Sequence, residues 1–326
     1  MLRLIRVVLM LALCTRLCCA QNPGVKVLPW GNHPAAVSLT FDDARPVHLD
    51  VAVSELNKRH LRATFFVIVS KLTRLDDWRK VQLEGHEIGN HSLTHPHPEA
   101  LSKGDEELQV EDAKLFLDSN FHSDILVFAY PYAEMSSGLA YWVKRYNFAA
   151  RGWRGDKNPL YVTADPDPDW YNLPSQPAYT KYGLDIYKSW IEKAISMHAW
   201  TTLQIHGIGD PSTGFEPIPT ATFTSLLDFL RAEQDQGLWV APFGEVAAYL
   251  RAQRVFEKAQ PQTKGNETLI SWDLPKPFPK GVILKVMVRG NGHQRLFQGN
   301  HELRRTRDGI YLVSFDAKEL VVRGRA

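Results

Sequence analysis

Two pairs of residues in this sequence have the types and spacing needed for chemistry. The adjacent carboxylates Asp42 and Asp43 directly follow the apolar stretch 37–41. Successive side chains diverge at the end of a strand, so one carboxylate could bind a metal while the other acts as a base. His91 and His95 have the four-residue separation that brings two imidazoles to one face of a helical turn. One carboxylate and two imidazoles, with positions left for water, are typical of a catalytic divalent metal site.

The segments that must position these residues alternate between apolar runs and helical patterns. Short apolar runs predict buried strands, and apolar residues at helical spacing between them predict helices. This many β-α repeats without a glycine-rich nucleotide loop predicts an α/β fold built on a parallel barrel. The functional residues of such a barrel lie at the carboxyl ends of its strands. The predicted strands are 35–41, 63–68, 86–90, 125–130, 148–151, 202–205 and 239–241, and the predicted helices are 49–56, 78–84, 106–117, 186–195, 223–230 and a last one through Tyr249.

The pattern changes near residue 255. A polar linker at 260–265 is followed by short strand-like runs without helices between them. We therefore expect a barrel domain over residues 21–255 and a small β-rich accessory domain over residues 256–326. The accessory domain could bind carbohydrate, but we expect it to pack on the barrel, because no aromatic run marks a sugar platform.

The N-terminal residues have the pattern of an export signal. Arg3 and Arg6 form a positive start, 7–13 is apolar, and small residues precede a cleavage site after Ala20. A signal peptide over residues 1–20 predicts a secreted or periplasmic protein, and its apolar run is too short for stable membrane insertion. All three cysteines lie in this segment, so we expect no disulfide or thiolate chemistry in the mature chain.

The composition is that of an ordinary globular protein, with 44% hydrophobic and 23% charged residues. The formal net charge of +2 is close to neutral, so it gives no reason to propose nucleic acid or an anionic membrane as a partner. Nothing in the sequence indicates an oligomeric state.

The motif Thr-Phe-Asp-Asp at 40–43, followed by His-Ser-Leu-Thr-His at 91–95, resembles the NodB-homology polysaccharide deacetylases, carbohydrate esterase family four. The resemblance covers roughly residues 31–253 and implies a distorted (β/α) barrel. It also implies that the second aspartate and the two histidines bind one divalent metal ion and that the first aspartate is the catalytic base. Zn²⁺ is the expected ion, with Co²⁺, Ni²⁺ or Mn²⁺ as alternatives. These roles fall on the following residues: Asp43, His91 and His95 for the metal, and Asp42 for the base.

Two later segments are similar to further motifs of that family. Residues 128–132 resemble its third motif, which implies that the main-chain N–H of Tyr132 holds the oxyanion. Residues 203–207 resemble its last motif, which implies that His206 is the general acid. The family usually carries an Arg in place of Ala129. Variants with Ala-Tyr-Pro-Tyr in the third motif tend to carry an Arg on the next strand, which makes Arg151 the expected partner of the base, with Arg154 as the second choice.

The resemblance implies a metal-dependent hydrolase that acts on linear amides. Its substrate would be an acetylated carbohydrate, from which it removes the acetyl groups of N-acetylated amino sugars and releases acetate. The bound ion would activate water and the acetyl carbonyl, Asp42 would remove a proton, and His206 would protonate the departing amine. Three alternatives stay open: an O-acetyl esterase on a polysaccharide, a hydrolase of a small cyclic amide, and a non-catalytic carbohydrate-binding protein.

Overall fold

The computed structural model describes residues 24–152, 160–288 and 294–324. The predicted signal peptide at 1–20 and Arg154 lie outside these ranges, so both stay predictions. Among the helices in the described ranges, none combines the length and the apolar character needed to cross a bilayer.

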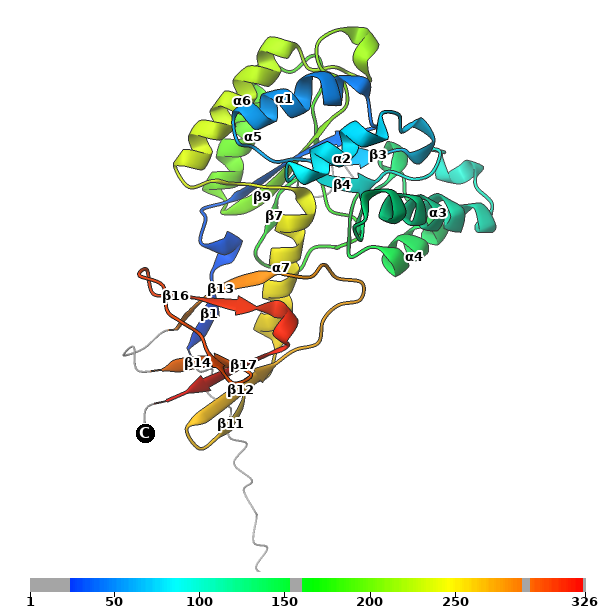
Figure 1. The fold of residues 1–326 in the computed structure, drawn as a ribbon. Helices are drawn as coiled ribbons and strands as arrows, with labels where there is room; N and C mark the ends of the chain where they lie inside the picture. Colours follow the sequence, from blue (N-terminus) through cyan, green and yellow to red (C-terminus); the bar gives the residue numbers. More distant parts are fainter. Residues whose placement is uncertain (1–23, 153–159, 289–293, 325–326) are drawn as a thin grey trace, which may run out of the picture.

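A curled sheet of mainly parallel strands forms the centre of the molecule (Figure 1). Its strands lie in the order β6-β5-β4-β3-β2-β9-β7, and β7 is antiparallel to β9. A backbone bridge joins Arg151 on β6 to Leu173, and β8 then pairs with β9, so the sheet curls back on itself. This is the distorted α/β barrel that the sequence predicts. The strands are β2 (Ala36–Asp42), β3 (Thr64–Val67), β4 (Glu87–Asn90), β5 (Val127–Ala129), β6 (Ala149–Arg151), β7 (Val162–Thr163), β8 (Gln176–Pro177), β9 (Ala199–Ile205) and β10 (Trp239–Val240).

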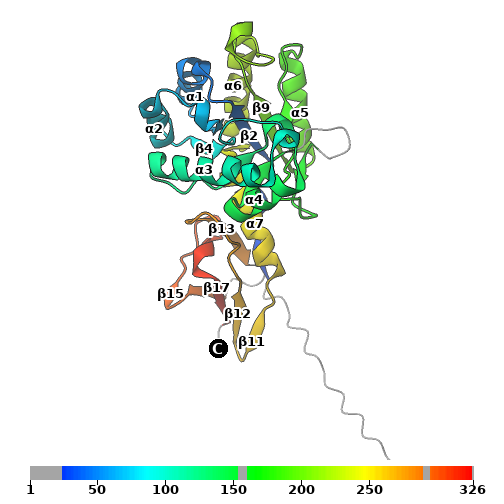
Figure 2. The ribbon, with the colours of Figure 1, turned by 90° about the vertical axis from the view of Figure 1, so that its right-hand side faces the viewer.

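Helices cover the outside of the barrel (Figures 1 and 2). Every residue of β2 and β9 is buried, because helices pack on one face of these strands and the barrel interior covers the other. The longest helix starts at a capping box, in which Ser102 and Asp105 satisfy each other's backbone N–H groups. The barrel helices are α1 (Val53–Lys58), α2 (Leu75–Leu83), α3 (Lys103–Phe121), α4 (Ser137–Tyr146), α5 (Leu184–Ser196) and α6 (Thr220–Asp235).

The strands β11 to β17, which we call the C-terminal β module, form two antiparallel sheets. β1 precedes the barrel in sequence but pairs with β13 in the smaller sheet, which has the order β1-β13-β16. The larger sheet has the order β11-β12-β17-β14-β15. Trp272, Leu284 and Phe315 belong to the apolar core of this part. The strands are β1 (Val25–Val27), β11 (Gln262–Lys264), β12 (Glu267–Ser271), β13 (Ile283–Val288), β14 (Arg295–Gln298), β15 (His301–Glu302), β16 (Ile310–Ser314) and β17 (Glu319–Arg323).

Helix α7 (Phe243–Lys258) connects the barrel to the C-terminal β module, and it contributes to both cores. Phe243 and Leu250 belong to a barrel core, whereas Ala252 and Phe256 belong to the core of the module. The module lies below the barrel in both ribbon views (Figures 1 and 2). A cavity of about 650 Å³ between the two parts is lined by residues at the starts of β4 and β13. The module therefore lies at the amino ends of the barrel strands, away from their carboxyl ends.

Candidate active site

The predicted metal ligands lie at the carboxyl ends of two barrel strands. β2 ends at Asp42, and Asp43 follows it with a left-handed φ of 81°. His91 follows the end of β4, but the segment from His91 to His95 is a loop and not the helical turn that the spacing predicts. Ser92 and His95 have left-handed φ angles of 71° and 62°, which a right-handed helical turn does not contain. Side chains hold the loop in this conformation: Asn90 Oδ1 accepts from Ser92 N at 2.8 Å, and Ser92 Oγ accepts from His95 N at 2.9 Å.

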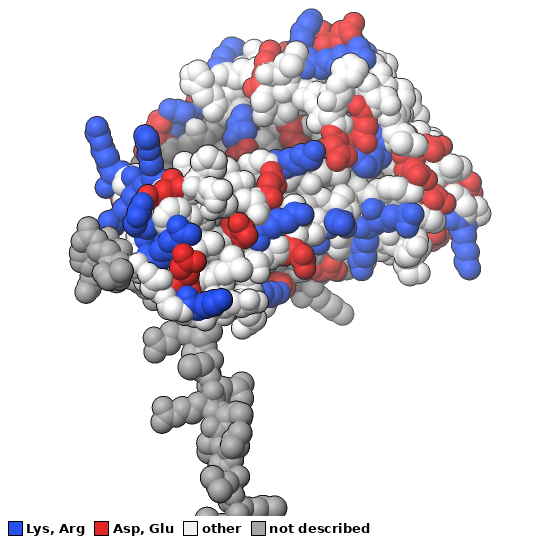
Figure 3. All heavy atoms as spheres, turned by 60° about the horizontal axis from the view of Figure 1, so that its bottom comes forward, with Lys and Arg blue, Asp and Glu red and all other residues white. Residues whose placement is uncertain are grey.

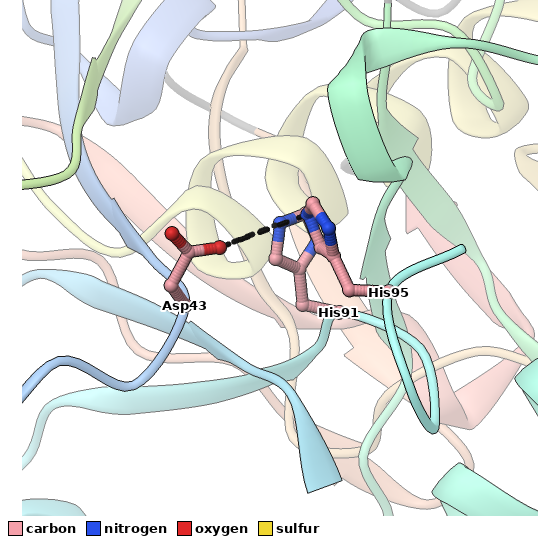
Figure 4. A group of neighbouring side chains, drawn as sticks. All are labelled: Asp43, His91 and His95. Atoms are coloured by element: carbon pink, nitrogen blue, oxygen red, sulfur yellow. Dashed lines mark ion pairs between the residues drawn. The ribbon is translucent and has the colours of Figure 1, made fainter. Parts of the chain in front are cut away.

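The loop still brings the three predicted ligands together (Figure 4). Asp43 Oδ1 lies 3.7 Å from His91 Nε2 and 3.7 Å from His95 Nε2. One ligand atom from each residue lies within 4.8 Å of the other two. Tetrahedral zinc with ligands at about 2.1 Å separates neighbouring ligand atoms by about 3.4 Å. The donor set therefore fits one divalent ion after small inward movements.

Hydrogen bonds from neighbouring groups orient these ligand atoms. His91 Nδ1 donates to the main-chain carbonyl of Ala129 at 2.7 Å, which directs Nε2 toward Asp43. Arg45 donates to Asp43 Oδ2 from Nε at 3.1 Å and from Nη2 at 2.8 Å, which leaves Oδ1 for the two histidines. Such outer contacts are typical of metal sites, where they fix the tautomer and the ring orientation. Arg45 was not among the residues that the sequence predicted for the site.

The protonation states also suit metal binding, because ligands must be deprotonated carboxylates and neutral imidazoles. Burial alone would raise the pKa of Asp43, but the nearby His91 and the hydrogen bond from Arg45 hold it below its usual value. Burial and the neighbouring His91 lower the pKa of His95 to about 4, although Asp43 opposes this effect. At neutral pH, Asp43 is therefore ionised and His95 is neutral.

The second carboxylate, Asp42, is fully buried and has a different environment. Arg151 Nη2 donates to Oδ1 at 2.7 Å and to Oδ2 at 2.6 Å, and the Arg151 side chain is 2% exposed. Burial alone would raise the pKa of Asp42, but Arg151, His91 and His206 hold it well below its usual range. Arg151 thus lies where the sequence predicts the cation that replaces the arginine missing at Ala129.

Gln204 is a site residue that sequence reasoning missed. Its Nε2 donates to Asp42 Oδ2 at 2.8 Å, and its side chain is buried. Gln204 lies on β9 two residues before His206, so strand alternation directs both side chains to the same face. The sequence did contain a signal for Gln204: it is an amide side chain at an inward-facing position of an otherwise apolar strand.

His206 follows β9 and lies beside Asp42. Its Nε2 is 3.7 Å from Asp42 Oδ2, and its main-chain carbonyl accepts a hydrogen bond of 2.6 Å from His48 Nε2. Burial lowers the pKa of His206, and the carboxylates of Asp42 and Asp43 oppose this effect. The His206 ring also contacts Phe215 edge to face, with 5.5 Å between ring centroids.

Tyr132 lies beside the metal-ligand cluster, in the turn after β5. Its ring centroid is 4.5 Å from that of His95 and 3.7 Å from that of His97, on which it stacks. The side chain of Tyr132 is 44% exposed, so it belongs to the rim of the site. Among the described residues, the metal-ligand cluster comprises Asp43, His91 and His95, and His97 stacks on Tyr132 outside it.

Strained backbone is concentrated around this cluster. Six residues other than glycine in three loops have positive φ angles, which cost of order 1–3 kcal/mol each and persist only where the surroundings enforce them. Such strain is typical of functional sites. The six residues are Asp43, Ala44, Ser92, His95, Tyr132 and Ala133.

Comparisons with known proteins give partial matches to this chain. Residues 31–150 match the family model described as polysaccharide deacetylase. The chain is 38% identical over 85 residues to a chitooligosaccharide deacetylase of Sinorhizobium fredii, covering 26% of this chain and 40% of that protein. It is 26% identical over 124 residues to a peptidoglycan-N-acetylglucosamine deacetylase of Bacillus cereus, covering 37% of this chain and 45% of that protein. It is also 26% identical over 250 residues to a gellan lyase of a Bacillus species, covering 70% of this chain and 10% of that protein.

The chain therefore spans less than half of the length of each of these three relatives. Among solved structures, it is similar to a peptidoglycan deacetylase of Bacillus subtilis, with 19% identity, coverage of 70% of this chain and 96% of that chain, and a TM-score of 0.44. It is also similar to a carbohydrate esterase family four pseudoenzyme of Bacillus anthracis, with 20% identity, coverage of 66% of each chain and a TM-score of 0.47. The residues that match the polysaccharide deacetylase model, 31–150, contain the cluster of Asp43, His91 and His95.

Proposed function

We propose that this protein is a metal-dependent hydrolase that removes acetyl groups from N-acetylated amino sugars of a poly- or oligosaccharide and releases acetate. The observation that carries the proposal is the separation of two adjacent carboxylates into two environments. Asp43 faces the nitrogens of His91 and His95, whereas Asp42 accepts hydrogen bonds from Arg151 and Gln204. This arrangement supports one metal ligand and one free base in the same site.

In this proposal, Asp43, His91 and His95 hold one divalent ion. Imidazole nitrogens and a carboxylate oxygen are common ligands of Zn²⁺, which is the proposed ion, with Co²⁺, Ni²⁺ or Mn²⁺ as alternatives. When bound, the ion would supply Lewis-acid activation of the attacking water and of the acetyl carbonyl.

The remaining residues move the proton and hold the developing charge. Asp42 takes a proton from the attacking water, and Arg151 keeps the carboxylate ionised and oriented for this step. The main-chain N–H of Tyr132 donates to the oxyanion. Because the pKa of His206 is lowered, its ring is neutral before the reaction. The proton can pass from Asp42 to His206 Nε2 when their 3.7 Å separation shortens, and from there to the departing amine.

The substrate class and the location are part of the proposal. Two relatives are named as deacetylases of chitooligosaccharide and of peptidoglycan N-acetylglucosamine, and these names support an N-acetylated amino sugar as the substrate. The gellan lyase match covers 10% of that protein, so its named activity is not proposed here. The predicted signal peptide supports a secreted or periplasmic location, with residues 21–255 as the catalytic domain and 256–326 as the accessory domain.

The test compares acetate release from N-acetylated chitooligosaccharides with release from O-acetylated xylooligosaccharides, using the Zn²⁺-loaded protein. We expect acetate from the N-acetylated substrate and none with the Asp42→Asn variant. Release from the O-acetylated substrate alone would replace the proposal with an O-acetyl esterase. Binding of either oligosaccharide without acetate release would indicate a non-catalytic carbohydrate-binding protein.

A further inference from the structure

Charge is distributed unevenly along this chain, although its formal net charge is only +2. Residues 259–326 contain twelve Lys and Arg against six Asp and Glu, which gives a net charge of +6. Residues 24–258 contain 23 Lys and Arg against 30 Asp and Glu, which gives −7. The near-neutral total therefore hides a basic C-terminal part attached to an acidic barrel. Such asymmetry between parts of a chain indicates that the basic part binds an anionic partner.

The positive charge of the C-terminal β module includes three exposed arginines in one loop. Arg304, Arg305 and Arg307 lie in the loop between β15 and β16, and all three are exposed. No ion pair is recorded for any of them within the described ranges, whereas Arg295 pairs with Glu302. Figure 3 shows Lys and Arg side chains gathered on one side of the lower face of the molecule, where the module lies.

This cluster borders a concave surface. A cavity of about 610 Å³ is lined by Arg295, Arg304 and Arg305, together with one carboxylate, Glu302, and Tyr311. Its lining arginines outnumber the carboxylate, so the cavity is positively charged. A guanidinium presents several N–H donors in one plane and binds carboxylates through paired hydrogen bonds, which suits repeated anionic groups on a chain.

The cavity also contains an acceptor suited to a hydroxyl group. Gln294 lines it, and Gln294 Oε1 is buried without a hydrogen-bond partner among the described residues. A buried acceptor without a partner costs free energy, and a hydroxyl donated by a ligand would recover it. An acidic sugar carries both carboxylates and hydroxyl groups. The arginines of the cavity can bind the carboxylates, and Gln294 Oε1 can accept a hydrogen bond from a hydroxyl group. We propose that the C-terminal β module binds an anionic, carboxylate-bearing polysaccharide at this arginine-lined cavity.

This binding site is separate from the proposed active site. The module lies at the amino ends of the barrel strands, whereas Asp42, Asp43 and His91 lie at the carboxyl ends. A sugar bound at the cavity therefore does not contact the catalytic residues. The module would hold the protein on an acidic glycan matrix and would leave the chemistry of the active site unchanged.

Two other anionic partners fit the cavity less well. Proteins that bind single-stranded nucleic acid present exposed aromatic rings for base stacking, but the aromatic residue lining this cavity, Tyr311, is 8% exposed. Proteins that lie on anionic membranes present an amphipathic helix with apolar side chains that insert. The arginines here lie in a loop between two strands, around a concave surface.

The test measures binding of the full chain to polygalacturonate at low salt and at 0.3 M NaCl. Uncharged dextran, vesicles containing anionic lipid, and single-stranded DNA serve as comparison ligands. We expect polygalacturonate to bind more tightly than all three, and high salt to weaken that binding, because the contacts are between exposed charges.

The variant is the triple substitution Arg304→Ser, Arg305→Ser and Arg307→Ser. Its matched control removes the same charge from the barrel surface by Lys80→Ser, Lys103→Ser and Lys193→Ser. We expect at least a tenfold loss of polygalacturonate affinity in the arginine variant, less than twofold in the control, and equal acetate release from a small N-acetylated substrate in both.

A further variant with lysine at the three arginine positions keeps the charge. It should retain only part of the affinity for polygalacturonate, because lysine lacks the planar guanidinium group that forms paired hydrogen bonds with a carboxylate. Equal losses in the arginine variant and the barrel control would overturn the proposal. So would the absence of binding by the unmodified chain, or tighter binding of vesicles or DNA than of polygalacturonate. These readouts measure binding alone, so their failure is distinguishable from a failure of the proposed deacetylation.

Discussion

Arg151 Nη2 donates to both carboxylate oxygens of Asp42, at 2.7 and 2.6 Å, and joins the end of β6 to the end of β2. The two residues are 109 positions apart in sequence and both are buried. A buried carboxylate without a cation would take up a proton, because burial favours the neutral form. The ionised state that the proposed base requires therefore depends on this contact.

Arg151→Ala should lower turnover by about 10- to 100-fold, the usual cost of removing an orienting partner. Without the guanidinium the pKa of Asp42 rises, so the acidic limb of the pH–rate profile should move to higher pH. Metal content should not change. The measurements are a pH–rate profile on an N-acetylated oligosaccharide and metal analysis, with the partly exposed Arg231→Ala as the control. An unshifted acidic limb in Arg151→Ala would reject the pairing of Arg151 with Asp42. A shift in Arg154→Ala instead would assign that pairing to Arg154.

Asp43→Ala and Asp42→Asn should have different effects on the metal. Loss of Asp43 removes one of three ligands, so the purified variant should contain little metal. Asp42→Asn should keep the metal and lower turnover by about two to four orders of magnitude, because it loses only the base. Metal analysis of both proteins separates the two roles. Equal metal loss in both variants would contradict the assignment of Asp42 as a free base.

Gln204→Leu should lower turnover by about tenfold, because it removes the hydrogen bond to Asp42 Oδ2 that helps to orient this carboxylate. Gln204→Glu should cost more, since a second carboxylate beside Asp42 raises the pKa of the pair and moves the acidic limb to higher pH. The matched control is Gln176→Leu, a buried glutamine that bonds Thr201 instead. If Gln204→Leu retained normal turnover and an unchanged profile, Gln204 would only fill space.

Glu87 should make the folded protein less stable as pH rises. Burial raises its pKa to about 7, although Thr64 Oγ1 and Gly244 N donate hydrogen bonds to it. The unfolded chain loses this proton near pH 4.5, so the folded state holds the extra proton between about pH 4.5 and 7. Stability is therefore lost across that window.

Glu87→Gln should remove this loss and stabilise the protein at pH 8 by at most about 3 kcal/mol relative to the unmodified chain. At pH 4.5 the two proteins should differ little. Urea unfolding at both pH values measures the difference, and the exposed Glu99→Gln is the matched control. A variant that is equally destabilised at both pH values would show that the hydrogen bonds of Glu87 matter more than its charge.

The sequence was sufficient to predict the convergence of the main site residues. Parallel strands end on the same side of a sheet, so residues placed after the strands β2, β4 and β6 had to lie near one another. This rule places Asp42, Asp43, His91 and Arg151 together. It does not give the conformation of the loops. The segment from His91 to His95 differs from the expected helical turn because Ser92 and His95 have left-handed φ angles, a conformation that the side chains of Asn90 and Ser92 support by accepting hydrogen bonds from the loop backbone.

Other features depend on contacts that are distant in sequence. β1 has three residues, too few for their alternation to predict a strand, and its partner β13 lies more than 250 residues away. Helix α4 was not predicted because its buried residues Leu139 and Val143 are accompanied by the exposed Tyr141, which obscures the apolar period. Gln204 resembles any strand glutamine until its amide is seen beside Asp42.

Helix α7 has a consequence for how the molecule can move. Its residues belong both to a barrel core and to the core of the C-terminal β module, so bending it would expose apolar surface in both. The module is therefore expected to keep a constant orientation and not to act as a tethered arm. A glycan held at the arginine-lined cavity stays at the far end from the catalytic opening. The acetylated chain that enters that opening must then be a different strand, or a distant segment of the same one.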